Sequence, residues 1–412
     1  MSRRYLLVSH IPFMRLDNVI MVDQLWANDL IELTANVGPI RLAAPEISSD
    51  EGHAAWGPKA VPIDPSVPIT FISLPPMKHS WDLWTRWKIQ RILKAEVEHA
   101  DIVHSSNAFN PYLCLLYAHF QAARLNKKTV FVVAEDYHDS LIWEWVRLAK
   151  TPFQRFMRDI VVSHMDRLMQ EAVAVASLSL LFTPAVVRRF RLYAANGIAV
   201  RDTTHTLNDI ISEDAFAQKC QAIASGTPLK LVAACRHKPL KGLDYIIRAI
   251  AELKKRDIYV EADLYGDGPM TAELTHLAKY LDVDDRVRLP GILTADHKIF
   301  KAIADAHIGL MLHRTNEFAR ALYDSLAGAT PVLAFRTPAS EGSVRDGTDG
   351  MLIPLDNAIA LAVAIERLNN DRSLLINLCK NSRDRAKSET RTIWHKFRSD
   401  LIEELFSKDI KT

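Results

Sequence analysis

Short apolar runs alternate with helical stretches along most of the chain, and this alternation is the strongest constraint on its fold. The run Tyr5–Ser9 is followed by helical spacing over Asp23–Asn36 and then by a second run, Ile40–Ala44. Strand, helix and strand in this order form a βαβ unit, whose strands lie parallel in one sheet. Further runs at Thr70–Leu74 and Thr129–Ala134 continue the pattern. We therefore predict an α/β protein built on parallel sheets.

The alternation is interrupted once, over residues 209–228, and restarts at Leu229. A chain of 412 residues is long for a single core, so we expect two domains. The predicted parts are an N-terminal domain at 1–208, a linker at 209–228, a C-terminal domain at 229–390 and a last helix within 391–412. Two such blocks predict two doubly wound, Rossmann-like domains facing each other across a cleft. Ligands of such sheets bind at the carboxyl ends of the strands.

Composition excludes several classes of protein. The 51 Lys and Arg residues nearly balance the 49 Asp and Glu residues, so no overall charge favours nucleic acid as a partner. The four cysteines show no CxxC spacing, which argues against a disulfide scaffold or a zinc site and favours a reducing compartment. The apolar run near the N-terminus is too short for a signal sequence, and no run reaches the length of a membrane span. We expect a cytoplasmic protein.

The stretch Leu229–Gly242, LKLVAACRHKPLKG, carries the clearest chemical signal. A buried strand would lead into a loop with Arg236 and Lys241, and Gly242 would then begin a helix. Backbone N–H groups and the helix dipole favour an anion at such a turn, and the two cations add to this. The sequence therefore predicts a phosphate site, although two solvated loop cations fit the same pattern.

Later motifs follow this stretch in a characteristic order. They are Tyr265-Gly266-Asp267-Gly268-Pro269, Val287–Gly291, Ala327–Val332, Arg345–Leu352 and Trp394. Together with Arg236 and Lys241, they resemble the GT-B glycosyltransferases, in particular family 4 (the group 1 glycosyltransferases). The resemblance covers about a third of the chain, Leu229–Leu368. It implies a C-terminal helix that crosses back to the first domain.

The same resemblance implies an enzyme that moves a sugar from a nucleotide-sugar donor to a glycan or lipid-linked acceptor in cell-surface polysaccharide biosynthesis. It further implies retention of anomeric configuration, no divalent metal and no cofactor. A non-catalytic nucleotide-sugar-binding subunit and a GT-B epimerase or hydrolase are the alternatives. The residues that it places at the donor are Arg236, Lys241, Gly242, Tyr265, Gly266, Gly268, Pro290, Gly291, Phe318, Ala319 and Asp324.

The chain departs from the family at the donor sugar. The family carries two glutamates eight residues apart, and counting back from Pro331 puts Asp324 at the second position and Asn316 at the first. Glu317 lies one residue out of register. We expect Asn316 to face the sugar, with Glu317 as the alternative. Asp324 is expected to accept hydrogen bonds from the donor ribose, the alternative being an ordinary residue on the helix surface.

Polar residues after strands of the first domain are candidates for the acceptor site: Glu135, Asp136, His138 and His104. Of these, Glu135 and His104 are our candidates for catalysis, and ordinary loop residues are the alternative for each.

The helix Trp81–Lys94, WDLWTRWKIQRILK, combines tryptophans with basic residues. This pattern fits peripheral binding to an anionic membrane surface, here the inner face of the membrane, and equally a core-facing aromatic stripe with a solvated basic side. Many members of the family that the chain resembles act on lipid-linked acceptors, which favours membrane binding.

Overall fold

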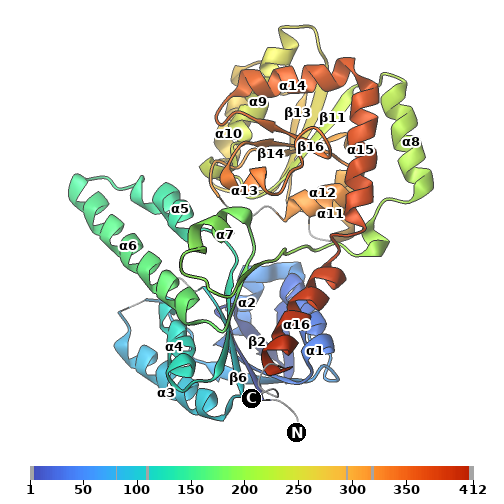
Figure 1. The fold of residues 1–412 in the computed structure, drawn as a ribbon. Coiled ribbons are helices and arrows are strands. Elements are labelled where there is room, and N and C mark those ends of the chain that lie inside the picture. The colour runs from blue at the N-terminus through green and yellow to red at the C-terminus, as the bar shows by residue number, and fades with distance from the viewer. Residues whose placement is uncertain (1–3, 80, 108–110, 294–295, 317–319, 408–412) are drawn as a thin grey trace. The chain divides into compact units, whose positions relative to one another are not determined.

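The computed structural model describes residues 4–407 except 80, 108–110, 294–295 and 317–319 (Figure 1). The chain divides into two units. The first comprises residues 1–138, 159–201 and 392–412, and the second comprises 139–158 and 202–391. Each unit contains a mainly parallel sheet with helices on both faces, so the predicted α/β class with two doubly wound units is confirmed.

The first unit contains a ten-stranded sheet in the order β10-β9-β8-β7-β1-β4-β2-β3-β5, with β6 also paired to β4. Its strands are β1 (Tyr5–Val8), β2 (Phe13–Leu16), β3 (Val19–Asp23), β4 (Ile40–Ile47), β5 (Ala60–Pro62), β6 (Ile69–Leu74), β7 (Ile102–Ser106), β8 (Lys128–Val133), β9 (Leu178–Leu181) and β10 (Gly197–Ala199). The helices that precede residue 202 are α1 (Gln24–Val37), α2 (Ser49–Trp56), α3 (Leu83–His99), α4 (Leu116–Arg124), α5 (Tyr137–Leu141), α6 (Pro152–Val175) and α7 (Pro184–Phe190); residues 139–158, which include parts of α5 and α6, belong to the second unit. The antiparallel hairpin β2–β3, which turns at Asp17 and Asn18 with positive φ, was not predicted from the sequence.

Alternate residues of β1 point to opposite faces of this sheet, as the pleat requires. Tyr5 and Leu7 pack in a core with α1, whereas Leu6 and Val8 pack in a second core with α3 and α4. Helix α16 (Arg391–Ser407) packs in the α1 core through Ile402. The predicted return of the C-terminal helix to the first unit is therefore confirmed.

The second unit has a six-stranded sheet in the order β13-β12-β11-β14-β15-β16, and all its described pairings are parallel. The strands are β11 (Leu229–Ala234), β12 (Val260–Tyr265), β13 (Val287–Gly291), β14 (Ile308–Met311), β15 (Val332–Phe335) and β16 (Gly350–Ile353). The helices are α8 (Glu213–Ala224), α9 (Leu243–Lys254), α10 (Thr271–Tyr280), α11 (Asp296–Ala304), α12 (Ala321–Ala327), α13 (Pro338–Glu341), α14 (Ala358–Asn370) and α15 (Arg372–Ala386). The strand order reverses between β11 and β14, so a ligand is expected at the carboxyl ends of these two strands.

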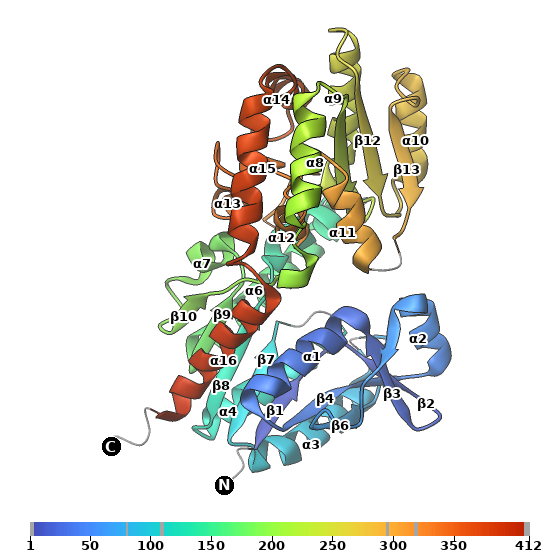
Figure 2. The same ribbon diagram turned by 90° about the vertical axis from the view of Figure 1, so that its right-hand side faces the viewer.

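The predicted linker at 209–228 contains helix α8, which lies beside α15 in the second unit (Figure 2). The hydroxyl of Ser212 caps this helix, and Ile223 is fully buried. The apolar pattern was hard to recognise because Lys219 occupies a buried position of the same face. Its ammonium donates to the carbonyl oxygen of Gly328 and to Thr330 Oγ1, both at 2.8 Å, which compensates for burying a polar group.

Candidate functional site

The loop after β11 carries the two cations that the sequence singled out. The short 3-10 helix η5 (Pro239–Lys241) leads through Gly242 into α9. Gly242 has φ 63°, and a Cβ there would lie 2.3 Å from the backbone oxygen of Leu312, so only glycine fits. Arg236 is exposed, whereas Lys241 is only 8% exposed. Two cations therefore lie close in sequence to a helix N-terminus, an arrangement suited to an anion.

A second glycine turn packs directly on this loop. A Cβ at Gly266 would lie 1.9 Å from the carbonyl oxygen of Cys235, and one at Gly268 would lie 2.6 Å from that of His237. The backbone N–H of His237 also donates to the carbonyl of Asp267 at 2.9 Å. A side chain at either glycine would push the two loops apart, so both glycines fix the shape of this edge.

The residues predicted beside the nucleobase lie at the same edge. Tyr265 and Gly291 are register partners in β12 and β13, and the N–H of Gly266 donates to the carbonyl of Gly291 at 2.9 Å. Pro290 precedes Gly291 in β13 and is exposed. The structure thus brings Tyr265, Gly266 and Gly291 together, and their contact with a nucleotide stays a prediction.

His237 is a residue of this site that sequence reasoning missed. Its ring is fully buried, and its Nδ1 lies 2.8 Å from the hydroxyl of Thr271. That hydroxyl also donates to the carboxylate of Asp267 at 2.7 Å. Burial lowers the pKa of His237 and favours the neutral ring. Its position directly after Arg236 was the one feature of the sequence that could have indicated it. His237 connects the loop that carries Arg236 and Lys241 (the cation loop) to the turn that contains Gly266 and Gly268 (the glycine turn).

The loop after β14 is bonded to the cation loop. The backbone N–H of Arg314 donates to the carbonyl of Leu240 at 2.8 Å. The guanidinium of Arg314 is bound by both carboxylate oxygens of Asp356, each at 2.6 Å. Two residues further, the backbone N–H of Asn316 donates to Asp139 Oδ2 at 2.7 Å. The predicted sugar-facing position therefore has a carboxylate beside it, supplied from a distant part of the sequence.

Three predicted residues, Glu317, Phe318 and Ala319, lie outside the described residues. Asp324, predicted to bind the ribose, lies on α12 and accepts a hydrogen bond from the hydroxyl of Thr204. A ribose hydroxyl at this carboxylate would have to share it with Thr204. The sequence could not indicate this partner, because Thr204 lies outside every motif.

Residues 139–147 form a further contact with the two loops. Two guanidinium groups lie over the Trp143 ring, that of Arg147 at 3.9 Å and that of Arg314 at 4.6 Å from the ring centroid. The carboxylate of Glu144 lies 2.6 Å from the ammonium of Lys238. Both loops of the candidate donor site are thus held by one segment, residues 139–147, which begins within α5.

His104 lies within β7, which continues to Ser106, and this corrects its predicted location after the strand. Its Nδ1 lies 2.6 Å from the hydroxyl of Tyr5, and the ring is buried. Burial, with the nearby charge of Arg398, lowers the pKa of His104 to about 3. Burial also raises the pKa of Tyr5, so a protonated hydroxyl and a neutral imidazole share this hydrogen bond. These contacts are those of a neutral histidine in the core of the sheet.

Glu135 and Asp136 do follow β8, as predicted, and His138 lies in α5. Asp136 is buried, and its carboxylate lies 3.4 Å from Arg189, which also binds Asp166 at 2.6 Å. Glu135 and His138 are half-buried, so each retains a solvent-accessible surface.

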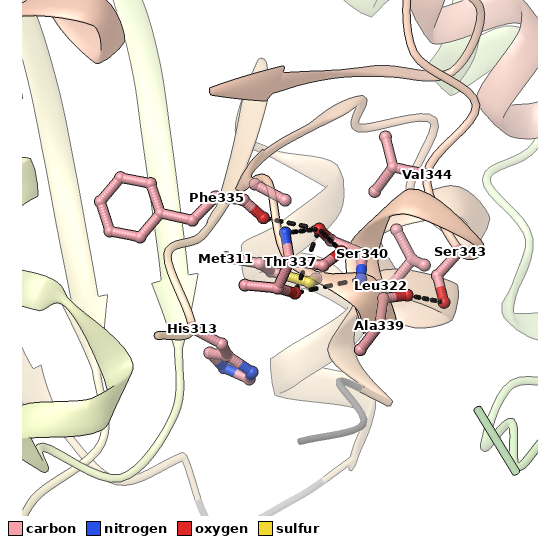
Figure 3. A pocket seen from close by; sticks show the side chains of 10 residues that line it. Met311, His313, Leu322, Phe335, Thr337, Ala339, Ser340, Ser343 and Val344 are labelled. Carbon is pink, nitrogen blue, oxygen red and sulfur yellow. Dashed lines mark hydrogen bonds between the residues drawn. The ribbon is translucent and has the colours of Figure 1, made fainter. Parts of the chain in front are cut away.

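A small pocket of about 30 Å³ opens at the carboxyl ends of β14 and β15 (Figure 3). Apolar side chains, among them Met311, Leu322 and Val344, form much of its wall. The hydroxyl of Thr337 caps α13, and Ser340 donates to the carbonyl of Phe335 at 2.6 Å. These polar groups are satisfied by the protein, so the pocket offers a ligand chiefly apolar surface.

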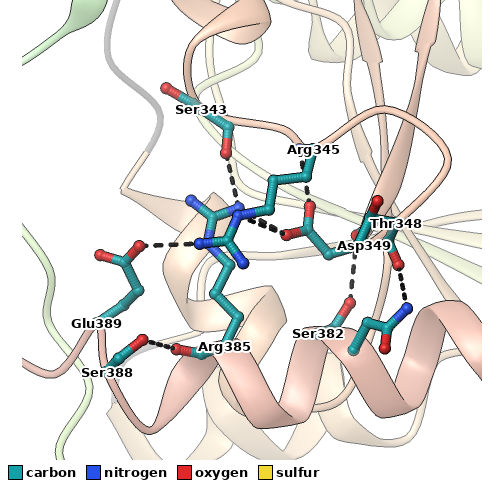
Figure 4. A network of polar contacts seen from close by, with 9 residues as sticks. Ser343, Arg345, Thr348, Asp349, Ser382, Arg385, Ser388 and Glu389 are labelled. Atoms are coloured by element: carbon teal, nitrogen blue, oxygen red, sulfur yellow. Dashed lines mark hydrogen bonds and ion pairs between the residues drawn. The ribbon is translucent and has the colours of Figure 1, made fainter.

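The turn Arg345–Leu352, one of the recognised motifs, is held by a buried ion network (Figure 4). Arg385 lies 2.8 Å from the carboxylate of Asp349 and 3.2 Å from that of Glu389. Arg385 also donates to the carbonyl of Ser343 at 2.8 Å. All three charged side chains are almost fully buried, so this network has a structural role at the end of α15.

Within the part of the chain that the structure describes, no group of three or more His, Cys, Asp or Glu side chains is arranged to hold a metal ion. In the same residues, no helix is long and apolar enough to cross a bilayer.

Comparison with known proteins finds similarity over part of the second unit. Residues 228–371 match the model of the family described as glycosyl transferases group 1. The chain is 31% identical over 144 residues to the lipopolysaccharide core biosynthesis glycosyltransferase LpsE of Rhizobium meliloti, covering 35% of this chain and 40% of that protein. It is 27% identical over 142 residues to alpha-D-kanosaminyltransferase of Streptomyces kanamyceticus, covering 34% and 36% of the two chains. The chain thus spans two fifths or less of the length of these curated relatives.

Solved structures share the fold over the whole chain. HepE of Anabaena in complex with UDP-glucose has a TM-score of 0.66 at 15% identity, covering 98% of this chain and 99% of that chain. WaaG, a glycosyltransferase involved in lipopolysaccharide biosynthesis, has a TM-score of 0.65 at 14% identity, covering 97% and 99%. These likenesses show that the fold is that of the GT-B glycosyltransferases.

Proposed function

We propose that this chain, which carries a group 1 glycosyltransferase region at residues 228–371 in a GT-B fold, transfers a sugar from a nucleotide donor to a glycan or lipid-linked acceptor in cell-surface polysaccharide biosynthesis. The observation that carries the proposal is that Arg236 and Lys241 lie on one loop, which is shaped by Gly242, Gly266 and Gly268. Such a loop is suited to the diphosphate of a nucleotide sugar.

The positive charge of this loop suits the reaction, which must stabilise a leaving group that becomes more negative. When the bond between sugar and diphosphate breaks, negative charge grows on the leaving diphosphate. Arg236, Lys241 and the N-terminus of α9 would stabilise that charge, and groups aimed at developing charge are commonly worth about 3–4 kcal/mol each. Fixed cations of this kind can replace a divalent metal, which is why we propose a metal-independent enzyme without a cofactor. Retention of anomeric configuration is proposed from the family resemblance.

The donor would bind along the carboxyl ends of the strands of the second unit. Tyr265 and Gly291 would shape the base pocket, Asp324 would accept from the ribose, and Asn316 would face the sugar. Two of the similar structures were solved with UDP and with UDP-glucose. We therefore propose a uridine nucleotide sugar as the first donor class to screen.

We also propose that α3 brings the protein to an anionic membrane surface. The exposed fractions of Trp81, Leu83 and Trp84 are 73%, 71% and 64%, so these side chains do not form the core-facing stripe that was the alternative. Lys88 lies over the Trp84 ring at 5.3 Å, so a cation and an aromatic ring share this surface. Exposed tryptophan beside basic residues suits the interface between lipid headgroups and acyl chains.

A nucleotide-sugar-binding subunit without turnover is the second candidate. The amide side chain at Asn316 and the contact of Asp324 with Thr204 favour it, because both weaken the expected acidic pair. Release of free nucleotide separates the two proposals, since a binding subunit holds the donor intact. An epimerase or hydrolase would release product without transfer to an acceptor.

The decisive experiment screens uridine, guanosine and adenosine diphosphate sugars by thermal shift and then measures nucleotide release with the donor that binds. Arg236→Ala and Lys241→Ala should each lower turnover by roughly 100-fold or more, because each removes a cation from the leaving diphosphate. Arg248→Ala is the matched control, since Arg248 lies on α9 and pairs with Asp244 at 3.7 Å. Turnover within threefold of wild type for both loop variants would refute the assignment.

A further inference from the structure

Asp139 is the starting point of the inference, because its carboxylate lies at the loop proposed to face the donor sugar. Asp139 Oδ2 accepts the backbone N–H of Asn316 at 2.7 Å, across 177 residues of sequence. The described residues of that loop, 313–316, read His-Arg-Thr-Asn and carry no carboxylate of their own. Asp139 thus places a carboxylate against the described part of this loop, at Asn316.

The segment that carries Asp139 is held by charged and aromatic contacts on both sides. The contact of the Trp143 ring with the guanidinium of Arg314, 4.6 Å from the ring centroid, anchors it to the loop after β14. The ion pair of Glu144 with Lys238 anchors it to the cation loop. These anchors are independent of each other, so the position of Asp139 does not depend on the one hydrogen bond to Asn316.

The charge of Arg314 is already balanced by Asp356, which binds the guanidinium through both oxygens. Arg314 is therefore suited to hold the Trp143 ring rather than to bind a phosphate. Its backbone bond to Leu240 keeps the same platform attached to the cation loop. The segment and the two loops are consequently fixed relative to one another within the second unit.

We propose that Asp139 supplies the carboxylate that stabilises the positive charge on the donor sugar during transfer, with Trp143 and Glu144 as positioning residues. This inference rests on the proposed glycosyltransferase function. As the diphosphate leaves, electron deficiency develops at the anomeric carbon and ring oxygen of the sugar. An anionic oxygen fixed beside the sugar stabilises that state more than the neutral ground state, which raises the rate of the chemical step. Asp139 forms no bond to the sugar in this proposal.

The test measures nucleotide release by the full-length protein with the donor identified by the screen. Asp139→Asn should lower kcat by about 100-fold or more and leave the donor KM within about threefold, since the charge acts on the transition state. Asp139→Glu should recover part of kcat. Asp159→Asn is the matched control, because Asp159 is an exposed aspartate of α6 and should behave as wild type.

Nucleoside diphosphate binding, measured by calorimetry, separates a role in catalysis from a structural role. Asp139→Asn should bind the diphosphate with unchanged affinity, which also shows that the variant is folded. Trp143→Ala should lower kcat with the same unchanged affinity, and Trp143→Phe should restore most of it, because a phenyl ring can still stack on Arg314.

Several results would overturn the inference. If kcat of Asp139→Asn stays within threefold of wild type, the carboxylate has no part in transfer. If that variant binds the diphosphate more tightly and keeps its kcat, Asp139 merely occupies an anion site. If Glu317→Gln abolishes turnover while Asp139→Asn does not, the charge comes from Glu317. Failure of the wild type to release nucleotide from any donor would instead remove the proposed function itself, and the inference with it.

Discussion

His104→Asn should remove one acid-sensitive component of stability from the first unit. Burial lowers the pKa of His104 from 6.5 to about 3. Below pH 6.5 the unfolded chain therefore binds a proton at this residue that the folded chain does not bind until the pH approaches 3. This contribution to stability is fully present above about pH 6.5 and is lost as the pH falls. The loss is about 2 kcal/mol at pH 5 and approaches about 5 kcal/mol below pH 3.

The assay is urea unfolding of wild type and variant at about pH 7.5 and pH 5. Asparagine does not titrate, so wild type should lose about 2 kcal/mol more than His104→Asn between these values. The other buried histidines are common to both proteins and cancel in the difference. His53→Asn, which changes an exposed histidine, is the control and should keep the wild-type pH dependence.

The same variant tests the predicted catalytic role of His104. Because the ring lies within β7 and is bonded to Tyr5, nucleotide release at about pH 7.5 should stay within about threefold of wild type. Parallel pH dependences of wild type and variant would refute the reasoning from burial. A loss of turnover of about 100-fold without any change in pH dependence would place His104 in the acceptor site instead.

The remaining predictions concern the metal and the membrane. Nucleotide release should continue in EDTA, because Arg236 and Lys241 supply the positive charge; complete loss that manganese restores would contradict the metal-independent mechanism. The protein should float with liposomes that contain anionic lipid, and Trp84→Ala with Lys88→Glu should weaken flotation several-fold, since these exposed side chains form part of the proposed contact. Flotation that is equal for wild type and variant, or equal on neutral liposomes, would mean that α3 makes no such contact.

The cation loop could be found from the sequence because its signals are local. Apolar spacing indicates β11 and α9, and Gly242 with Arg236 and Lys241 lies within the few residues between them. Glycine turns are equally local, since a short segment with positive φ or a close backbone approach requires glycine whatever surrounds it. For the same reason the alternation of strands and helices predicted two parallel-sheet units before any tertiary contact was known.

The structure differs from the expectations drawn from the sequence where the role of a side chain depends on residues distant along the chain. Lys219 reads as solvated, yet Gly328 and Thr330 allow it to be buried in α8. His104 reads as a polar residue at a strand end, yet the extent of β7 and the hydroxyl of Tyr5 place it in the core. Neither partner lies within one helical turn or one strand of the residue that it satisfies, so no local pattern could reveal it.

The sequence by itself determined the alternation of strands and helices in two blocks and the position of the loop that is predicted to bind phosphate, because periodicity and turn chemistry act over a few residues. Only the tertiary structure decided that 139–147 belongs with the second unit and that Asp139 lies against Asn316. These contacts depend on how side chains from separate segments pack and pair their charges, and sequence spacing carries no information on that. A carboxylate from 177 residues away along the chain therefore lies against Asn316, a contact that no motif indicates.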